Sequence, residues 1–392
     1  GVTTYTIRVV YETLDGNYSE VEGTGRYDDI SLIDAKTGDT VTSYQAYVSN
    51  LSHILALDLK GFAFDENKKD ESTTITADGL SIVRVYMARQ SYKLKLVIAD
   101  NIDSVTVSTS TNTHKLVEGE ANTYLIRYED TITLTASEKA GYKDASFTVS
   151  TEDSFAGATI NVNTIKMSGA ENENELKKGI TILASAVAKE NTKYTIKIVR
   201  EKLDGTYDSE NADYTFQAQG KTGSTLTEDI VLAEIENASD LAELLKGYHK
   251  RDITFDPNDK IAGDETTEVI VRYERNNHTL TIVDISEYND AIEKLEDTLF
   301  NVAQDFKFGT AVEFTFVVNK GFAATTDMFK LYDEEGNIVD ILTVEEITEG
   351  VEEGKQQFVV TFNIPDKNTY LKVYAEAKEN TQYTIKVNKQ KT

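Results

Sequence analysis

The sequence predicts a mainly β protein of four modules, in which two α+β modules alternate with two small β-sandwiches. Three observations lead to this prediction. A phrase beginning Tyr-Thr-Ile returns at Tyr5, Tyr194 and Tyr383, in steps of 189 residues. Each repeat contains several short segments that alternate apolar and polar residues, as strands do, and at least one segment with helical spacing. A duplicated unit of this size indicates an array of modules rather than a single catalytic domain.

The length and charge of the chain narrow the classes of protein to which it can belong. Its 392 residues are too many for one core and predict two to four domains. A net charge of −27 repels nucleic acid and anionic membranes. No apolar stretch approaches the roughly 18 residues that cross a bilayer, so we expect neither nucleic-acid binding nor membrane insertion. The absence of cysteine excludes disulfides and thiolate metal sites.

The first strand and the turn after it recur in both repeats. Residues 5–10 alternate as a half-buried strand does. Asp15-Gly16 and Asp204-Gly205 follow at the same offset, and an Asp-Gly pair is typical of the tight turns that close hairpins. We interpret these aspartates as turn residues rather than as ligands.

A helix is expected next in each repeat. In the first repeat the apolar side chains step by three and four, so we expect one buried helical face over residues 40–55, formed by Val41, Tyr44, Val48, Leu51 and Leu55. The second repeat has an Asp-x-x-Glu capping pattern, a leucine-rich turn and a C-cap glycine, at Asp240 and Glu243, at 241–245 and at Gly247. Strands are expected to close each α+β module, at 61–65, 82–87 and 92–97, and at 253–256, 269–273 and 279–283. A helix across one face of a sheet is the expected arrangement.

The second half of each repeat shows period-two segments with short polar turns, which predicts a β-sandwich. The first sandwich is expected to use strands at 128–136, 145–150 and 181–187. The second is expected to use 312–318, 321–322, a hairpin about 335–337, 357–362 and 370–377. The second sandwich also has apolar residues spaced by four and three, which predicts an extra helix near 287–303 formed about Tyr288, Ile292, Leu295, Leu299 and Val302. We interpret this helix as packing on the sandwich, with presentation of a partner-binding face as the alternative.

The first and third modules resemble a known family of bacterial surface repeats, the internalin-type B-repeat or Listeria–Bacteroides repeat. The resemblance rests on several motifs, which are Tyr-Thr-Ile, Leu-Asp-Gly-x-Tyr at 14–18 and 203–207, Lys-Thr-Gly at 36–38 and 221–223, the Gly-Phe/Tyr and Phe-Asp pairs, and Tyr86-x-x-Arg89 or Tyr273-Glu274-Arg275. It implies a β-grasp fold, a sheet around one helix, strung in tandem outside the cell. The other two modules resemble bacterial immunoglobulin-like domains in strand pattern. Neither resemblance implies an enzymatic activity.

The predicted strands and helices and the two resemblances together predict four domains. They are a β-grasp-like module at 1–98, an Ig-like β-sandwich at 99–190, a second β-grasp-like module at 191–283, and a second Ig-like β-sandwich at 284–392 that includes the extra helix. No Pro-rich or Gly/Ser-rich linker separates them, so we expect short, stiff junctions.

The sequence offers no catalytic constellation. The four histidines are scattered and never stand at ligand spacing, at positions 53, 114, 249 and 278. His278 occupies the place of Tyr92 in the first repeat, which favours an aromatic packing role. No nucleophile elbow or phosphate loop is present. We therefore expect no enzymatic activity.

Two acidic loops are candidate calcium sites. Asp65 and Asn67, with Asp70 and Glu71, follow the first Phe-Asp pair, and Asp256 and Asn258, with Asp259, Asp264 and Glu265, follow the second. These are hard oxygen ligands of the kind that Ca²⁺ takes, but the glycine and bidentate glutamate of an EF-hand are missing. The favoured alternative is an Asx turn that closes each loop, so no cofactor is expected. A cross-link between a buried lysine and an asparagine remains a separate hypothesis for stiffening the chain.

We expect a non-catalytic stalk or adhesive region of a secreted or cell-surface bacterial protein, monomeric, whose length and duplication present a weak site multivalently. The alternatives are a module that binds a specific host or cell-surface protein or glycan, and an accessory region of a larger surface enzyme. The chain begins Gly-Val without Met, so we expect any native signal segment to have been removed. The expected extracellular or cell-surface location is based on the family resemblance.

Overall fold

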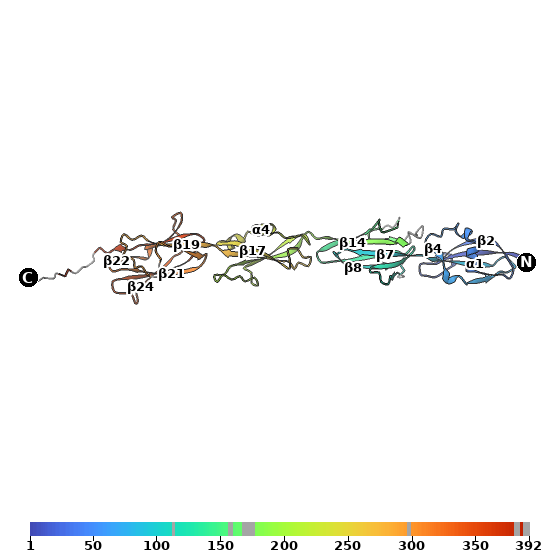
Figure 1. Ribbon diagram of the computed structural model, residues 1–392, viewed down its shortest axis with the longest axis horizontal. Helices are drawn as coiled ribbons and strands as arrows, with labels where there is room; N and C mark the ends of the chain where they lie inside the picture. The colour runs from blue at the N-terminus through green and yellow to red at the C-terminus, as the bar shows by residue number, and fades with distance from the viewer. Residues whose placement is uncertain (112–113, 156–159, 167–176, 296–298, 380–384, 387–392) are drawn as a thin grey trace, which may run out of the picture. The chain divides into compact units, whose positions relative to one another are not determined.

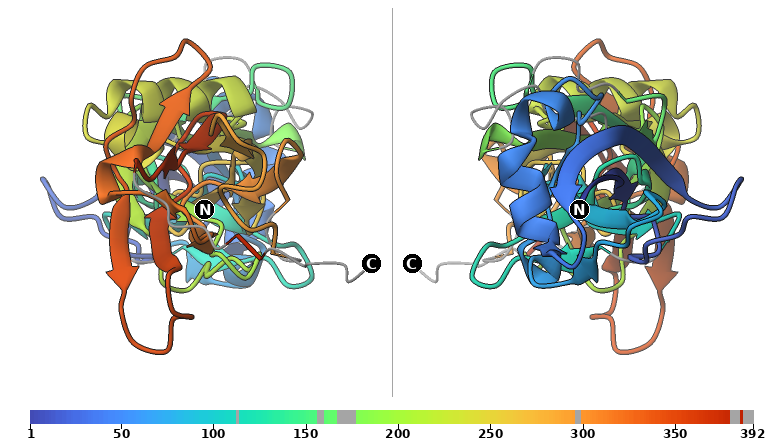
Figure 2. Two further views of the ribbon diagram at one scale, coloured as in Figure 1. Left: turned by 90° about the vertical axis from the view of Figure 1, so that its left-hand side faces the viewer. Right: turned by 90° about the vertical axis from the view of Figure 1, so that its right-hand side faces the viewer.

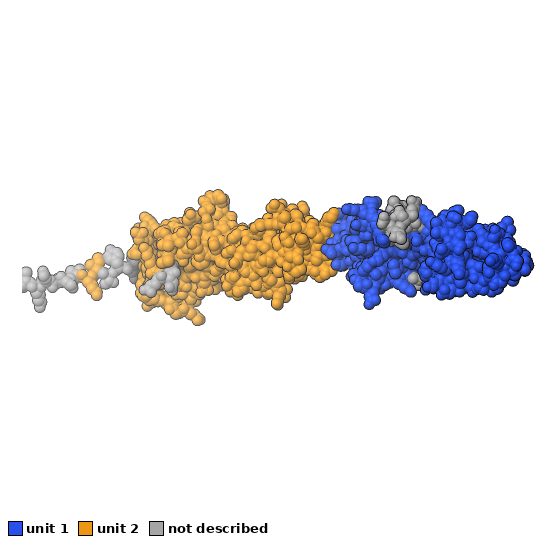
Figure 3. Space-filling view, turned by 45° about the vertical axis from the view of Figure 1, so that its right-hand side comes forward, with its two compact units in different colours: residues 1–190 blue, residues 191–392 orange. Residues whose placement is uncertain are grey.

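A computed structural model describes residues 1–111, 114–155, 160–166, 177–295, 299–379 and 385–386 (Figure 1). The protein is mainly β, with 49% strand and 9% helix, and it contains several separate sheets. This confirms the predicted β-rich class. The chain divides into two compact units, Gly1–Glu190 and Asn191–Thr392 (Figure 3). The third copy of the repeated phrase begins at Tyr383, which lies outside the described residues.

The first half of unit 1 is built on a mixed four-stranded sheet. Its strands run in the order β2-β1-β6-β4, with bounds β1 (Val2–Tyr11), β2 (Arg26–Lys36), β4 (Phe62–Phe64) and β6 (Ile82–Arg89). The central pair β1 and β6 is parallel, and the outer strands pair antiparallel. Alternation along β1 and β6 places Ile7, Val9, Val83 and Val85 in the core. A separate two-stranded sheet pairs β3 (Thr40–Thr42) with β5 (Ser72–Thr74). The 3₁₀ turn η1 (Glu66–Lys68) precedes β5 in the chain.

The predicted helix forms as two short segments, α1 (Ser43–Ser49) and α2 (Leu51–Ile54). Thr42 and Gln45 form a capping box at the start of α1. The predicted buried face is wrong for four of its five residues, because only Val41, which lies in β3, packs against the core. Small or well-placed side chains face the sheet, namely Ser43, Ala46, Asn50 and Ile54, whereas Tyr44, Val48, Leu51 and Leu55 are exposed. Ser43 and Ala46 let the helix lie close to the sheet, which turns the bulkier stripe outward.

The second half of unit 1 consists of two sheets that share one core. A five-stranded sheet has the order β12-β14-β7-β10-β9 and a three-stranded sheet the order β13-β11-β8. The strands are β7 (Ser91–Ile98), β8 (Ile102–Thr109), β9 (Lys115–Leu116), β10 (Thr123–Arg127), β11 (Thr131–Glu138), β12 (Tyr142–Val149), β13 (Thr164–Lys166) and β14 (Ile180–Ala188). Residues 92–97 were expected to close the sheet of the first module. That expectation is wrong, because β7 pairs with β10 and β14 instead.

The first half of unit 2 repeats the mixed sheet of unit 1. Its order is β16-β15-β18-β17, with bounds β15 (Thr192–Arg200), β16 (Tyr214–Gly220), β17 (Tyr248–Asp256) and β18 (Glu268–Arg275). β15 and β18 are parallel, as β1 and β6 are. The main helix is α4 (Glu228–Asn237), which the sequence analysis missed, and Thr227 caps it. The predicted Asp240 cap precedes only the one-turn helix α5 (Leu241–Leu244), and its side chain makes no capping hydrogen bond.

The second half of unit 2 again joins two sheets around one core. The larger sheet has the order β20-β19-β26-β23, the smaller one β21-β25-β24, and β22 pairs with β27. The strands are β19 (Asn277–Asp284), β20 (Ala303–Lys307), β21 (Ala311–Val318), β22 (Phe322–Ala323), β23 (Phe329–Asp333), β24 (Thr343–Ile347), β25 (Gln356–Asn363), β26 (Thr369–Val373) and β27 (Glu376–Ala377), with a 3₁₀ turn η2 (Thr326–Met328). As in unit 1, the strand expected to close the α+β module, here 279–283, pairs with the following sheet.

The extra helix predicted near 287–303 is absent from the described residues of that segment. Ile292 forms an antiparallel bridge with Val318, and Phe300 forms a parallel bridge with Ile282. Tyr288, Leu299 and Val302 are exposed. Pairing with the neighbouring strands therefore overrides the helical spacing, and the described residues of this segment are irregular, with two isolated β-bridges.

Candidate functional site: the junction within each unit

The two halves of each unit meet at a connector of one residue. Gln90 joins β6 to β7 in unit 1, and Asn276 joins β18 to β19 in unit 2. The amide of Gln90 donates to the carbonyl of Gly61 at 2.9 Å, and its carbonyl accepts from the amide of Tyr128 at 2.9 Å. A connector this short and this well bonded leaves little freedom for one half to move against the other.

The connector of unit 2 has the same bonds. The amide of Asn276 donates to the carbonyl of Gly247 at 2.9 Å, and its carbonyl accepts from the amide of Phe308 at 2.8 Å. The chain thus builds the same backbone contact twice, from residues that differ at the connector and at the aromatic position.

In each unit, the carboxylate of the glutamate that follows the first strand interacts with donors from both halves. In unit 1 the backbone amide of Arg89 donates to Glu12 Oε2 at 2.8 Å, and Arg127 Nη2 lies 2.5 Å from Glu12 Oε1. Arg127 belongs to β10, so this ion pair crosses the junction. Because Glu12 is largely shielded from water, the pair is less screened than a surface pair.

Glu201 has the same role in unit 2. Its Oε2 accepts from the backbone amide of Arg275 at 3.0 Å, and its Oε1 pairs with Lys307 of β20. Only 4% of the Glu201 side chain is exposed. Burial opposes its ionisation, but the hydrogen bonds from Lys307 and from the Arg275 amide outweigh that effect and hold the pKa of Glu201 below its ordinary value.

An arginine at the end of β6 and of β18 bridges to the next sheet. Arg89 Nη1 donates to the carbonyl of Tyr128 at 3.1 Å, and Arg275 Nη1 donates to the carbonyl of Phe308 at 2.7 Å. The guanidinium of Arg89 lies 5.0 Å from the ring centre of Phe62, and that of Arg275 lies 5.1 Å from the ring centre of Tyr248. These are cation–π distances.

In each junction, two aromatic rings, one from each half, pack edge to face. Phe62 and Tyr128 have ring centres 5.4 Å apart at 84°, and Tyr248 and Phe308 have ring centres 5.8 Å apart at 82°. Burial beside Glu129 raises the pKa of Tyr128. Edge-to-face pairs fix relative orientation as well as burying apolar area.

A glycine beneath each aromatic ring allows this contact. Gly61 has φ +81° and Gly247 has φ +82°, both in the left-handed region. A Cβ on either residue would lie 2.3 Å from the ring of Tyr128 or Phe308. The junction therefore requires glycine for backbone conformation and for space.

The histidines of unit 2 form a network that the sequence analysis missed. His278 Nε2 donates to Asp366 Oδ1 at 2.9 Å, and Asn276 Nδ2 donates to the same oxygen at 2.8 Å. His249 Nδ1 and Asn276 Oδ1 are 2.9 Å apart. These hydrogen bonds hold the pKa of Asp366 low against the effect of burial. The aromatic packing role expected for His278 is wrong, because its ring has a polar partner.

The predicted calcium candidates of unit 1 lie in a capped turn. Asp65 Oδ1 accepts from the amide of Asn67 at 3.0 Å, which is an Asx turn, and Asp65 Oδ2 accepts from the Tyr18 hydroxyl at 2.8 Å. Glu71 pairs with Lys68. The pKa of Tyr18 is raised by burial and by this contact with Asp65.

The candidates of unit 2 are arranged in a similar way. Asn258 Oδ1 accepts from the amide of Lys260 at 2.8 Å, and Asp256 is the last residue of β17. Asp264 accepts from Thr266. The described residues contain no group of three or more acidic or histidine side chains placed to hold a metal ion. Calcium binding stays an untested hypothesis.

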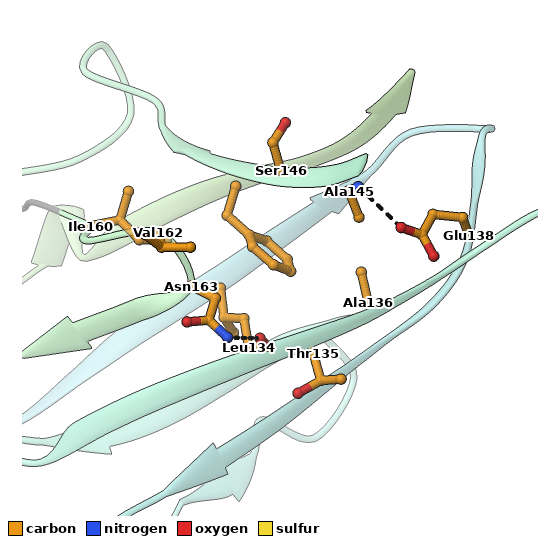
Figure 4. A pocket seen from close by; sticks show the side chains of 10 residues that line it. Leu134, Thr135, Ala136, Glu138, Ala145, Ser146, Ile160, Val162 and Asn163 are labelled. Carbon is orange, nitrogen blue, oxygen red and sulfur yellow. Dashed lines mark hydrogen bonds between the residues drawn. The ribbon is translucent and has the colours of Figure 1, made fainter. Parts of the chain in front are cut away.

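The second half of unit 1 has a pocket of about 530 Å³ between β11 and β12 (Figure 4). Its lining is mostly apolar. Glu138 is bonded to the amide of Ala145 at 3.0 Å, and Asn163 Nδ2 donates to the carbonyl of Leu134 at 3.1 Å. A carboxylate and an amide engaged in this way serve as structural bonds, and they do not form a pair of groups suited to acid–base chemistry.

Comparison with known proteins gives no family for this chain. No family model matches it, and no curated protein matches it. Among solved structures, a similarity is found to a chain titled "The Bacillus anthracis TIE protein", at 11% identity and a TM-score of 0.30, covering 96% of this chain and 68% of that one. A TM-score this low carries no argument. No helix in the described part of the chain is long and apolar enough to span a membrane.

Proposed function

We propose that this chain is a non-catalytic tandem-repeat stalk or adhesive region of a secreted or cell-surface bacterial protein. The single observation that carries the proposal is the junction built twice, once in each unit. Each junction combines a glutamate largely shielded from water, an arginine, a glycine and an edge-to-face aromatic pair. A binding or catalytic domain has no need for a rigid joint of one plan at two places. A stalk does, because stiff joints between successive modules keep the chain extended.

The proposal includes the module types. We infer that the first half of each unit is β-grasp-like, since a mixed sheet with parallel central strands and one helical segment recurs in both. We infer that the second half of each is Ig-like, since two sheets enclose one core. The acidic surface, at net charge −27, suits an exposed and soluble chain.

Small-angle scattering of the full chain tests the proposal. A compact globule of this length should have a radius of gyration near ~21 Å, and four modules end to end should give about 40 Å or more. We expect the larger value. The double variant E12A/E201A should widen the distribution of dimensions because the joints lose their central acceptor, whereas the surface control E352A should not. A value near that of a globule would reject the stalk.

A further inference from the structure

One sheet face in the second half of unit 1 carries a charge opposite to that of the whole chain. The strands β7, β9 and β10 contain four basic residues, no aspartate and no glutamate, in a chain with 67 acidic and 40 basic residues. The basic residues are Lys93, Lys95, Lys115 and Arg127. We call these four residues the basic face.

The strand register places the four basic side chains on one side of the sheet. Leu125 of β10 lies opposite Lys93 of β7 and opposite Lys115 of β9, and Arg127 follows Leu125 by two residues. Lys95 follows Lys93 by two residues on β7. Directly opposite residues of antiparallel strands, and residues two apart on one strand, point to the same side. The residues that alternate with the lysines of β7 are buried, so the basic face is the solvent side of the sheet.

A pocket of about 490 Å³ lies at one end of the basic face, where the two halves of unit 1 meet. In the right-hand view of Figure 2 the first half, in blue, lies in front of the second. The pocket is lined by Lys115 and Arg127 of the basic face and by Glu12 and Arg89 of the first half. The Arg89 side chain is 10% exposed, and its Nε is buried without a hydrogen-bond partner among the described residues. Because a buried donor without an acceptor costs free energy, an acceptor on a ligand is stabilising in this pocket.

Unit 2 has the same sheet positions without the positive charge. In the registers of the two sheets, Thr279 and Thr281 of β19 take the places of Lys93 and Lys95, and Asp305 of β20 takes the place of Leu125. The scaffold therefore does not require lysine at these positions. The two lysines are a property of unit 1.

Two more features of the pocket differ between the units. In the described residues the larger sheet of unit 2 ends at β20, so it has no counterpart of β9 and of Lys115. Arg275 Nε donates to the carbonyl of Glu201 at 2.9 Å, whereas Arg89 Nε lacks such a bond. A stalk built from two copies of one joint gives no reason for these differences, while a binding site in unit 1 does.

We propose that the basic face and its pocket bind an acidic polysaccharide, a chain of sugars that carry carboxylate groups. The cations complement the carboxylates, and Lys93 is available because its pair with Glu120 is nearly half exposed. The rest of the chain is acidic, at net charge −27 overall. A thin single polymer that touches only this face avoids the repulsion that a membrane or a nucleic-acid duplex would meet.

The geometry favours a sugar chain over an acidic peptide. Extended peptides commonly bind by pairing with a free sheet edge, but β7 and β10 are paired with neighbours on both sides, so only side chains can hold a ligand on this face.

A second pocket, of about 760 Å³, shares Glu12 and Arg89 with the first and is lined by Thr13, Asn17 and Ser19. Hydroxyl and amide side chains both donate and accept hydrogen bonds, as sugar hydroxyl groups do. Both pockets lie within the size range of ligand sites, about 300–1,000 Å³. A sugar chain longer than one ring can therefore use both pockets.

Titration calorimetry of the full chain with oligogalacturonate tests the proposal, and the fully methyl-esterified oligomer is the uncharged control. We expect saturable binding of the charged oligomer that weakens as salt is added, and no binding of the ester. The variant K93T/K95T takes the residues of unit 2 and should weaken binding by about tenfold. The variant K115T, on a different strand, should weaken it by about threefold.

The matched control is K193T/K330T, which removes two exposed strand lysines from unit 2 and changes the net charge by the same amount. It should bind as the unsubstituted chain does. Threonine is favourable in strands, and circular dichroism verifies that each variant is folded.

Three results would overturn the proposal. They are an absence of binding at low salt, equal weakening by K193T/K330T and K93T/K95T, and an affinity for polyglutamate as high as that for oligogalacturonate, which would make the ligand an acidic peptide. The inference goes beyond the stalk proposal, because a stiff chain need not bind a ligand. Scattering of K93T/K95T separates the two, since its dimensions should be unchanged whether or not the sugar binds.

Discussion

The junction of unit 1 and the junction of unit 2 share their backbone contacts and differ in their charged partners. Glutamate, arginine and glycine recur in both, at Glu12 and Glu201, Arg89 and Arg275, and Gly61 and Gly247. The cation that crosses to the glutamate is Arg127 in one and Lys307 in the other. The glycine, the arginine and the glutamate recur, while the cation, the connector residue and the two aromatic rings vary.

The two junctions also differ in the partners of the arginine and of the residues around the connector. Arg275 Nε donates to the carbonyl of Glu201 at 2.9 Å, whereas Arg89 pairs through Nη1 with Glu129, which is 40% exposed. Asn276 and His278 of unit 2 both donate to Asp366 Oδ1. Because the Glu201 side chain is 4% exposed and that of Glu12 is 17% exposed, we expect substitutions in unit 2 to have the larger effects.

The largest effect is expected when the glycine beneath the aromatic ring is replaced. G247A should lower the free energy of unfolding of unit 2 by about 3 kcal/mol, because it adds a left-handed alanine and a Cβ that collides with Phe308. The matched control is G336A, which has the same φ but open space around its Cβ, and which should cost about 1 kcal/mol. Hydrogen exchange of peptides from unit 2 measures both. Equal costs would show that the ring contact is unimportant.

Removing the glutamate charge is expected to come next. E201Q should destabilise unit 2 by about 2 kcal/mol, since it leaves Lys307 without its buried partner. E12Q should cost less in unit 1, because Glu12 is less buried than Glu201. The surface variant E352Q should stay within about 0.5 kcal/mol. A larger loss from E12Q than from E201Q would contradict the ranking of the two junctions.

The pH dependence of unit 2 follows from the same residue. The folded-state pKa of Glu201 is lowered, so its contribution to stability is present above the pKa of the unfolded chain and is lost as pH falls through the folded-state pKa. E201Q should therefore flatten the acid side of the stability curve of unit 2 relative to the unsubstituted chain. Denaturant unfolding at a series of acidic pH values measures it, and an unchanged acid slope would assign the ionisation elsewhere.

Particular elements show how much of the fold could be predicted from the sequence. Strands such as β1, β11 and β25 could be predicted from period-two alternation. Successive side chains of a strand point to opposite faces, so a strand with one buried face alternates apolar and polar residues. Spacing alone could not predict whether the apolar face of residues 40–55 meets the sheet or the solvent. An apolar stripe shows that a face exists, and whether it meets the sheet or the solvent depends on small residues such as Ala46 on the other side.

The junction was hidden by unequal spacing. Glu12 and Glu201 are 189 residues apart, Arg89 and Arg275 are 186 apart, and Tyr128 and Phe308 are 180 apart. A comparison at one period aligns only the first pair, and the second pair is recognised only through the Tyr86-x-x-Arg89 and Tyr273-Glu274-Arg275 motifs. A search that allowed short deletions within the repeat could have found all three, but their contact depends on a fold that brings β6 and β10 together.

The smallest effect is expected from the aromatic pair, where the two units already use different rings. Y128F keeps the edge-to-face contact with Phe62, so it should change the stability of unit 1 by no more than about 0.5 kcal/mol. F308Y should be similarly mild in unit 2, while Y128A should cost about 3 kcal/mol by removing the ring. Hydrogen exchange of peptides flanking Gln90 distinguishes these cases. If Y128F were as harmful as Y128A, the hydroxyl would have a role, and the two junctions would not be equivalent at this position.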